Sequence, residues 1–341
     1  MRYFYRYLII TLSGFFLLGW ILTQRLPIHN PWALAPVFSK NIRMDSQKLI
    51  DEQKPQVLLL GNSVINTGID ESQFESLTDQ KTLRSGFSGA ASAYYYLMIK
   101  NIIATASVPP KYLLLFFLDN LLTTPDLWVI GGNFLIRIDD IAGDQETVLL
   151  QKAYLNQINP LEGYLDSQLP LFGERQTLKG KIDNRIKYTL PQLFQNCAKL
   201  CLDKALDTVF DERNMLPLVL QQNAINLGRW SGKEWDFNAL VEKSFLPDMI
   251  QITREKGINL ILVREKNVRV MTLQDESSDM RKYFQDMADY LKKEGVPLLD
   301  FAHDPALTLD MFRDEMHLNS QGRLLFTRLV AEGFLTLLKE K

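Results

Sequence analysis

Three short, continuous apolar runs, together with two less apolar strand candidates and the helix-length segments between them, constrain the fold of this chain more than any other feature. Runs of this kind are typical of strands that are buried on both faces, as in parallel sheets. Their alternation with helical segments predicts right-handed crossovers that place helices on both faces of the sheet. We therefore predict an α/β fold, a three-layer α/β/α sandwich with a mostly parallel five-stranded sheet. The predicted strands cover residues 56–60, 81–87, 112–118, 259–263 and 297–301.

The segments between these runs have the apolar spacing and length of helices. Asp70 is a plausible N-cap for the first of them. The alternation stops between residues 121 and 230, where the pattern is mostly helical, so we predict a helical insertion or cap at 121–230 within an α/β domain of residues 52–341. The predicted helices cover residues 70–77, 90–106, 237–256, 277–293 and 319–339, with 146–157, 192–209 and 215–226 inside the insertion.

The N-terminal segment differs in composition from the rest of the chain. Residues 7–23 carry no charge and reach the short end of the length that spans a bilayer as a helix. Arg2 and Arg6 precede the run, which favours a cytoplasmic N-terminus with the remaining chain outside. We predict one N-terminal transmembrane helix at 1–25, a tether at 26–51, and a single-pass protein of the cytoplasmic membrane whose α/β domain is extracytoplasmic. A cleaved signal peptide is the alternative, although no small-x-small cleavage site directly follows the run.

The charge balance and the two cysteines narrow the function classes. Residues 1–25 hold three Arg and no acidic residue, which leaves 35 basic against 40 acidic groups in the remainder. A mildly acidic domain argues against nucleic acid as a partner. Cys197 and Cys201 lie four apart in a helical stretch, so a disulfide between them would close almost no loop, and two buried thiols are the preferred interpretation. Two cysteines are too few for a cysteine-rich zinc site, and we expect no cofactor.

Two polar blocks flank the predicted sheet. Ser63 follows the first apolar run in the sequence Gly61-Asn62-Ser63, and Asp314 lies three residues before His317, just ahead of the last helix. Ligands of open α/β sheets bind outside the carboxyl ends of the strands. A serine nucleophile needs a base, and the base needs an orienting acid. The blocks therefore predict a catalytic Ser63, His317 and Asp314.

These blocks resemble the SGNH/GDSL hydrolase superfamily. The first family block appears as Gly61-Asn62-Ser63 and the last as Asp314-Glu315-Met316-His317. The resemblance implies Ser63 as nucleophile, His317 as base and Asp314 as orienting acid, with no metal. It also implies backbone N–H groups of Ser63 and Gly86 as oxyanion donors, with Gly89 as the alternative to Gly86. The third block, Gly-x-Asn-Asp, does not match: Asp119-Asn120 stands there without a Gly two residues before Asn120, the candidate side-chain oxyanion donor.

A narrower resemblance concerns the whole organisation of the chain. One N-terminal helix followed by an external SGNH-like domain is similar to the membrane-anchored partners of MBOAT-type O-acyltransferases. That resemblance implies O-acylation, most simply O-acetylation, of a cell-surface polysaccharide or related polymer, with a membrane-bound O-acyltransferase as acyl donor. Two alternatives stay open from the residues: an SGNH esterase or deacetylase acting on an acylated glycan or lipid, and a non-catalytic scaffold for a polysaccharide-modifying complex.

Several other residues allow two interpretations. Arg264 follows a predicted strand, so it either contacts an anionic substrate or is a surface residue of a loop. The aromatic residues of the middle region either form a platform that stacks on sugars or pack in the core, which is the preferred interpretation for the tyrosines. His303 belongs to a predicted turn and His29 to the tether. The aromatic candidates are Tyr94, Tyr95, Tyr96, Trp230 and Trp235.

Overall fold

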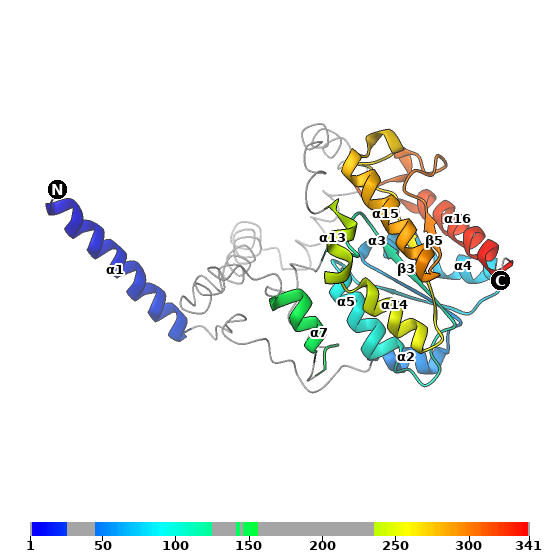
Figure 1. Cartoon of the computed structure of the whole chain (residues 1–341), viewed down its shortest axis with the longest axis horizontal. Coiled ribbons are helices and arrows are strands. Elements are labelled where there is room, and N and C mark those ends of the chain that lie inside the picture. Colours follow the sequence, from blue (N-terminus) through cyan, green and yellow to red (C-terminus); the bar gives the residue numbers. More distant parts are fainter. Residues whose placement is uncertain (1, 26–44, 125–140, 144–145, 156–234, 340–341) are drawn as a thin grey trace, which may run out of the picture.

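A parallel five-stranded sheet with helices on both faces forms the centre of the protein (Figure 1). The computed structural model describes residues 2–25, 45–124, 141–143, 146–155 and 235–339. The strand order is β2-β1-β3-β4-β5, and every pairing is parallel. The predicted five-stranded α/β sandwich is thereby confirmed. The strands are β1 (Val57–Gly61), β2 (Thr82–Gly86), β3 (Tyr112–Phe117), β4 (Asn259–Arg264) and β5 (Leu298–Asp300).

Each strand is followed along the chain by helical structure, and most predicted helices are present. Asp70 caps the helix that follows it, because its carboxylate accepts the backbone N–H of Gln73 at 3.0 Å. The α-helices are α1 (Arg2–Arg25), α2 (Asp45–Gln53), α3 (Ser63–Gly68), α4 (Glu71–Thr78), α5 (Ser92–Leu97), α7 (Thr147–Leu149), α13 (Phe237–Leu240), α14 (Leu246–Glu255), α15 (Ser278–Glu294) and α16 (Ser320–Lys339). The π-helical turns are Met98–Ile103 and Leu150–Leu155, and the 3₁₀ turns are Val241–Lys243, Leu273–Asp275 and Leu309–Met311.

The two faces of the sheet support two separate apolar cores. Successive strand residues point to opposite faces, so Leu58 and Leu60 of β1 join one core while Leu59 joins the other. The first core includes Tyr95 of α5, Met249 of α14 and Tyr283 of α15, and the second includes Phe74 of α4 and Phe326 and Phe334 of α16. Burial on both faces explains why the inner strands β1 and β3 are continuously apolar, while the edge strands β2 and β5 carry polar residues.

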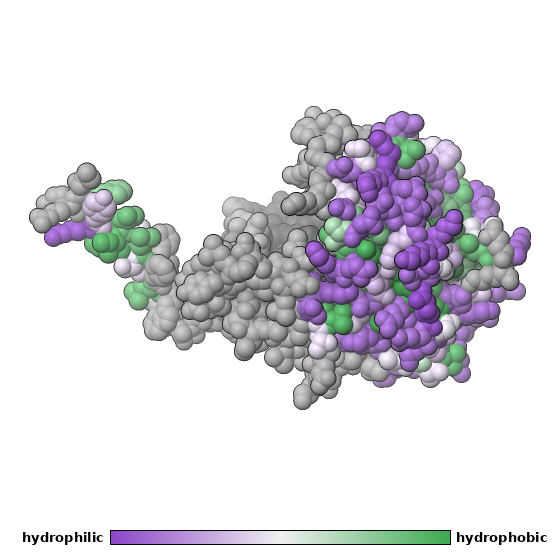
Figure 2. Space-filling model, viewed as in Figure 1, coloured by the Kyte–Doolittle hydropathy of each residue, from purple (hydrophilic) through white to green (hydrophobic). Residues whose placement is uncertain are grey.

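Helix α15 has the alternation of apolar and charged residues that places one face of a helix on the core and the other in solvent. Its buried side chains recur at helical spacing, and its other face is mostly charged. Ser277 caps its start by accepting the Met280 N–H, and Gly295 ends it at a φ of +68°. Figure 2 shows a largely hydrophilic outer surface over this side of the protein. The buried residues are Met280, Tyr283, Phe284, Met287 and Leu291.

Two predicted helices differ from the observed ones. The helix predicted at 237–256 is broken into α13, a 3₁₀ turn and α14, with Pro247 at the start of α14. The backbone is extended at Ser244, and Pro247 lies in the first turn of α14, where its missing N–H costs no helical hydrogen bond. One continuous helix would lose that bond, so the break has a local cause. The helix predicted at 90–106 begins at Ser92 and continues from Met98 as a π-helix, whose wider turn the apolar pattern does not reveal.

The start of α16 is packed closely against the turn that precedes it. Asn319 accepts the backbone N–H of Gly322 at 3.0 Å and donates to the carbonyl of Asp310 at 2.7 Å. A methyl group at Gly322 would lie 2.5 Å from the carbonyl oxygen of Met311, so only glycine allows this approach. The segment just before α16 is therefore fixed relative to the helix.

The N-terminal residues 2–25 form helix α1, as the uncharged run predicts. Within the described residues, no helix is long and apolar enough to cross a bilayer. The transmembrane helix stays a prediction. Most of the tether at 26–51 and most of the insertion at 121–230 lie outside the described residues, and so do His29, Cys197, Cys201 and Trp230. Of the tether, residues 45–51 belong to α2, and of the insertion, α7 and the π-helical turn Leu150–Leu155 are described.

Candidate active site

Ser63 lies where strand β1 is followed by a helix. Strand β1 ends at Gly61, and Ser63 is the first residue of α3. The side chain of Asn62 caps α3 by accepting the backbone N–H of Val64 at 2.9 Å. The cap holds Ser63 at the carboxyl edge of the sheet, half-buried, with its backbone N–H among the first helical donors. That place suits a nucleophile whose oxyanion must meet a helix N-terminus.

His317 and Asp314 are held in a short antiparallel turn, Phe312–Leu318, which we call the catalytic turn. Phe312 bridges to Leu318, and the backbone N–H of Arg313 donates to the carbonyl of His317 at 2.9 Å. The Oδ1 atom of Asp314 accepts the backbone N–H groups of Met316 at 2.9 Å and His317 at 2.8 Å. The carboxylate orientation is therefore set by the turn itself.

The three side chains meet in one hydrogen-bonded row. His317 Nε2 lies 2.9 Å from Ser63 Oγ, across 254 residues of sequence. On the other side of the ring, His317 Nδ1 lies 2.8 Å from Asp314 Oδ2 and 3.0 Å from Oδ1. An aspartate at Nδ1 favours the tautomer with the proton on Nδ1, which leaves Nε2 free to accept the serine proton.

The electrostatics of Asp314 suit an orienting acid. Burial alone would raise its pKa. The hydrogen bonds from the His317 ring and from the backbone N–H groups of Met316 and His317 outweigh that effect and lower the pKa below its usual value. Asp314 is therefore ionised at neutral pH, where it can stabilise the imidazolium that forms when His317 takes a proton.

The oxyanion candidates Ser63, Gly86 and Asn120 end or follow the three adjacent strands β1, β2 and β3. Gly86 is paired in register with Gly61, and its carbonyl accepts Asn66 Nδ2 at 3.3 Å. A methyl group there would lie 2.6 Å from Cγ2 of the fully buried Ile65 and 2.1 Å from Asn66 Oδ1, so the close packing of α3 on β2 favours glycine. The main-chain carbonyl of Asn120 accepts two backbone N–H groups of the following turn.

Asp119, which stands where the third family block does not match, is hydrogen-bonded and has a raised pKa. It has a φ of +48°, and its Oδ1 atom accepts Asn267 Nδ2 at 2.8 Å. Burial raises the pKa of Asp119 to about 6, although Arg264, Arg269 and the Asn267 amide each work in the opposite direction. The carboxyl group thus titrates near the pH range in which a serine–histidine site works.

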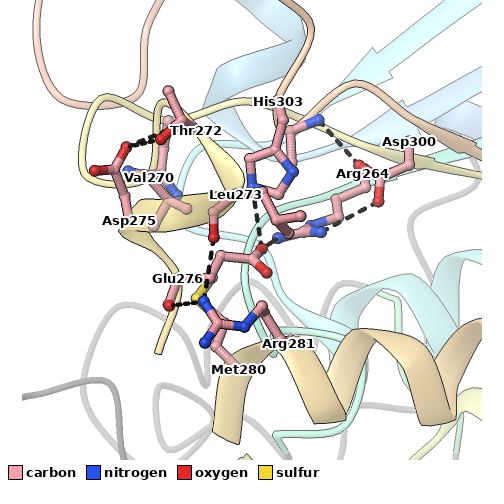
Figure 3. Close-up of polar contacts among 12 residues, drawn as sticks. Arg264, Val270, Thr272, Leu273, Asp275, Glu276, Met280, Arg281, Asp300 and His303 are labelled. Atoms are coloured by element: carbon pink, nitrogen blue, oxygen red, sulfur yellow. Dashed lines mark hydrogen bonds and ion pairs between the residues drawn. The ribbon is translucent and has the colours of Figure 1, made fainter. Parts of the chain in front are cut away.

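Arg264 is neither a surface loop residue nor an exposed anion ligand. It ends β4, is 3% exposed, and lies between Glu276 at 2.5 Å and Asp300 at 3.1 Å (Figure 3). Its guanidinium also lies 3.2 Å from the centre of the Phe284 ring. His303 Nε2 is 3.2 Å from the same Glu276 carboxylate, so the predicted turn at His303 joins this cluster. Burial lowers the pKa of His303.

The aromatic residues singled out from the sequence are mostly core residues where the structure describes them. Tyr95, Tyr96 and Trp235 are buried in the first core. Tyr94 is partly buried and stacks on Phe87 with ring centres 4.5 Å apart. Core packing is therefore the correct interpretation for the buried three.

Glu265 is a buried acid that sequence reasoning did not single out. It follows Arg264, is 3% exposed, and neither carboxyl oxygen has a hydrogen-bond partner among the described residues. It lines a cavity of about 10 Å³ together with Val64, Met316 and Leu318, the neighbours of Ser63 and His317. Burial raises the pKa of Glu265 to about 8. The only sequence signal is an acidic residue placed directly after an apolar strand.

The raised pKa of Glu265 predicts that the stability of the fold depends on pH. Between its ordinary pKa of 4.5 and about 8, the folded chain keeps a proton that the unfolded chain releases. The free energy of unfolding should therefore fall as the pH rises through this window, by up to about 1.4 kcal/mol per pH unit. Glu265→Gln should remove that slope in urea unfolding measured from pH 6 to 8, a range above the window in which the raised pKa of Asp119 contributes. The exposed Glu242→Gln is the control and should keep it; an unchanged slope in Glu265→Gln would contradict the assignment.

Comparisons with known proteins return matches among solved structures alone. No family model matches the chain, and no curated protein matches it. A GDSL-like lipase from Bacteroides thetaiotaomicron is 10% identical, with 86% of this chain and 98% of that one covered and a TM-score of 0.37. An acetyl xylan esterase is 12% identical over 81% and 98% of the chains, with a TM-score of 0.38. A candidate acylhydrolase from Bacteroides fragilis is 11% identical over 93% and 97%, with a TM-score of 0.35.

The resemblance to the SGNH/GDSL hydrolases rests on this chain's own features. The five-stranded parallel sheet carries Ser63 after its first strand, and the turn before the last helix carries Asp314 and His317. The hydrogen bonds between these side chains are those that a serine nucleophile, a base and an orienting acid require. The serine, histidine and aspartate singled out by that resemblance therefore form one hydrogen-bonded row at the edge of a parallel α/β sheet.

Proposed function

We propose that this protein is a serine-dependent acyl-transferring enzyme that forms an acyl-ester on Ser63. One observation carries the proposal: the continuous row of hydrogen bonds from Ser63 Oγ through the His317 ring to Asp314. A structural serine after a strand would need neither the base nor the acid. The intact row also weighs against the non-catalytic scaffold.

The proposed reaction has two half-reactions that use the same base. Ser63 Oγ attacks the carbonyl carbon of an O-ester while His317 Nε2 takes its proton, and the protonated His317 then gives that proton to the departing alcohol. The acceptor hydroxyl next gives its proton to His317 as its oxygen attacks the acyl-serine. The proton returns to Ser63 Oγ when the ester bond breaks. The oxyanion of each step would be stabilised by backbone N–H groups of Ser63 and Gly86.

We further propose that the acceptor is a sugar hydroxyl of a cell-surface polymer and that the transferred group is acetyl. The support comes from the sequence: an uncharged N-terminal run, an SGNH-like domain after it, and the resemblance to partners of MBOAT-type O-acyltransferases. In this proposal residues 1–25 anchor the chain in the cytoplasmic membrane. The α/β domain would then act outside the cytoplasm, with a membrane-bound O-acyltransferase as acyl donor.

Hydrolysis of the same acyl-serine is the second candidate. The His317 side chain is 19% exposed and Ser63 is half-buried, so water can reach both groups. Water as acceptor would make the protein an esterase or deacetylase with an identical first half-reaction. The two candidates therefore differ only in which hydroxyl reaches the acyl-serine first.

The acceptor can be tested directly on the purified full chain. An aryl acetate supplies the acyl group, an oligosaccharide is present in excess, and both products are measured. Acetyl ester on the sugar, absent with Ser63→Ala, supports transfer; acetate alone supports hydrolysis. A producing strain with Ser63→Ala that keeps full polymer acylation would contradict transfer. If the purified wild type also releases no acetate from the aryl acetate, hydrolysis is contradicted as well and the scaffold is favoured.

A further inference from the structure

The loop that follows β4 clamps the catalytic turn from outside. This loop, Lys266–Val270, is called the bracing loop here. The backbone N–H of Val268 donates to the carbonyl of Glu315 at 2.8 Å. Arg269 Nε donates to Glu315 Oε2 at 2.9 Å, and its Nη2 contacts the same oxygen. Glu315 lies directly after Asp314 in the catalytic turn.

The clamp acts on a single peptide group. The carbonyl of Glu315 accepts the Val268 N–H, and the N–H of Met316, which belongs to the same peptide plane, donates to Asp314 Oδ1 at 2.9 Å. The bracing loop therefore fixes the carbonyl of this peptide group, and the N–H of the same group orients the Asp314 carboxylate. Any rotation of the peptide would move the Asp314 carboxylate relative to the His317 ring.

The bracing loop is in turn anchored to the end of the neighbouring strand. Asn267 is 7% exposed, and its Nδ2 donates to Asp119 Oδ1 at 2.8 Å just after β3. Its own Oδ1 accepts the backbone N–H groups of Arg269 at 2.9 Å and Val270 at 3.1 Å, which shapes the loop. The Asn267 side-chain amide thus shapes the bracing loop and also connects it to the end of β3.

We infer that the bracing loop is a positioning element for catalysis, in which Asn267 holds the loop on Asp119 so that Val268 and Arg269 fix the catalytic turn. This inference rests on the proposed function, because it assigns these residues to the orientation of His317 and Asp314. None of them touches the reacting atoms. They act through the Glu315–Met316 peptide, and hence through the angle at which the imidazole faces Ser63.

The contacts predict an effect on rate that exceeds the effect on stability. Arg269 and Glu315 are 35% and 28% exposed at their side chains, and ion pairs of that exposure contribute about 1 kcal/mol or less to folding. Misplacing a catalytic group by about 1 Å, in contrast, can cost about a hundredfold in rate. Loss of the brace should therefore lower kcat at nearly constant KM.

The partner of the bracing loop, Asp119, is titratable, so a variant can make the contact depend on pH. The carboxyl group is faced by Arg264 from β4, Arg269 and Asn267 from the bracing loop, Glu315 from the catalytic turn, and Tyr283 from α15. Asn267→Asp keeps the oxygen that shapes the loop but sets a second carboxylate against Asp119. The second negative charge and the loss of the Asn267 amide both raise the pKa of Asp119 above its wild-type value. At high pH both groups would be charged and repel, while at low pH Asp119 can donate its proton to the new carboxylate.

The test compares three full-length proteins with the wild type. For Asn267→Asp we expect kcat for aryl acetate to fall about ten- to hundredfold at pH 8 with KM unchanged, and the loss relative to wild type to shrink at pH 5. The double variant Asp119→Asn with Asn267→Asp reverses donor and acceptor and should restore kcat to within a few fold at both pH values. Lys282→Ala removes an exposed ion pair with Asp286 on α15 and is the control.

Two results would overturn the inference. One is an Asn267→Asp variant within twofold of the wild type at pH 8; the other is a double variant that stays as slow as the single one. The Nδ1–H proton signal of His317 in NMR spectra reports the same geometry without any reaction. A wild type without turnover would therefore count against the proposed function, and an Nδ1–H signal shifted in Asn267→Asp and restored in the double variant would still support the brace.

Discussion

Ser63→Ala and His317→Ala are each expected to lower kcat for aryl ester turnover by about 10⁴- to 10⁶-fold, the range known for serine triads. Ser63→Ala removes the only oxygen within hydrogen-bond distance of His317 Nε2 among the described residues. His317→Ala leaves Ser63 without a base. Substrate binding should change little, because neither group is needed to hold the ester in its ground state.

The pattern across variants is more informative than any one rate. The Ser63→Ala/His317→Ala double variant should be no slower than either single variant, because the two groups act as one unit. Asp314→Asn should cost about 10⁴-fold, since an amide at this place no longer favours the Nδ1–H tautomer. Steady-state kinetics and far-UV circular dichroism on the same preparations separate lost chemistry from lost fold. A Ser63→Ala protein with more than about a tenth of the wild-type rate would contradict the account.

Glu276→Ala is expected to destabilise the protein by about 3–5 kcal/mol, the largest stability effect that the structure predicts. The Glu276 and Arg264 side chains are 1% and 4% exposed and lie 2.5 Å apart. Removing the carboxylate leaves a buried guanidinium whose remaining partner, Asp300, is 40% exposed. Denaturant unfolding of the wild type and the variant measures the difference.

The exposed ion pair Arg254–Glu294 is a control that separates the effect of burial from the effect of charge. Glu294→Ala removes the partner of Arg254, which is 60% exposed, and should cost about 1 kcal/mol or less. Replacing both Arg264 and Glu276 by Met should cost less than Glu276→Ala alone, because no unpaired buried charge remains. Equal losses for Glu276→Ala and Glu294→Ala would show that the cluster around Arg264 does not stabilise the fold as described.

The strands and most helices could be predicted because their causes are local. Continuous apolar runs mark buried strands, and Asp70 and Ser277 mark helix starts by side-chain caps that need no distant partner. The break at Pro247 was visible in the sequence as well, but the apolar spacing on both sides favoured one long helix. The π-helical turn at 98–103 departs from the 3.6-residue period that an apolar pattern reports.

The sequence singled out the candidate serine, histidine and aspartate. It did not reveal the residues that hold them in place. Ser63, Asp314 and His317 stand at places where a parallel sheet puts its ligands, and the family resemblance pointed to the same residues. Glu265, Asn267 and the pairing of Arg264 with Glu276 depend on contacts between loops that follow different strands. Such contacts carry no spacing signal, and charged residues in a loop read as solvent-exposed until the fold is known.

Covalent labelling of Ser63 tests the central claim most directly. The full chain is treated with a fluorophosphonate probe, which reacts with serines activated by a neighbouring base, and the intact mass is recorded. The account predicts one adduct on the wild type, mapped to Ser63, and none on Ser63→Ala or His317→Ala. A wild type that gains no adduct, or an adduct that persists in Ser63→Ala, would contradict it.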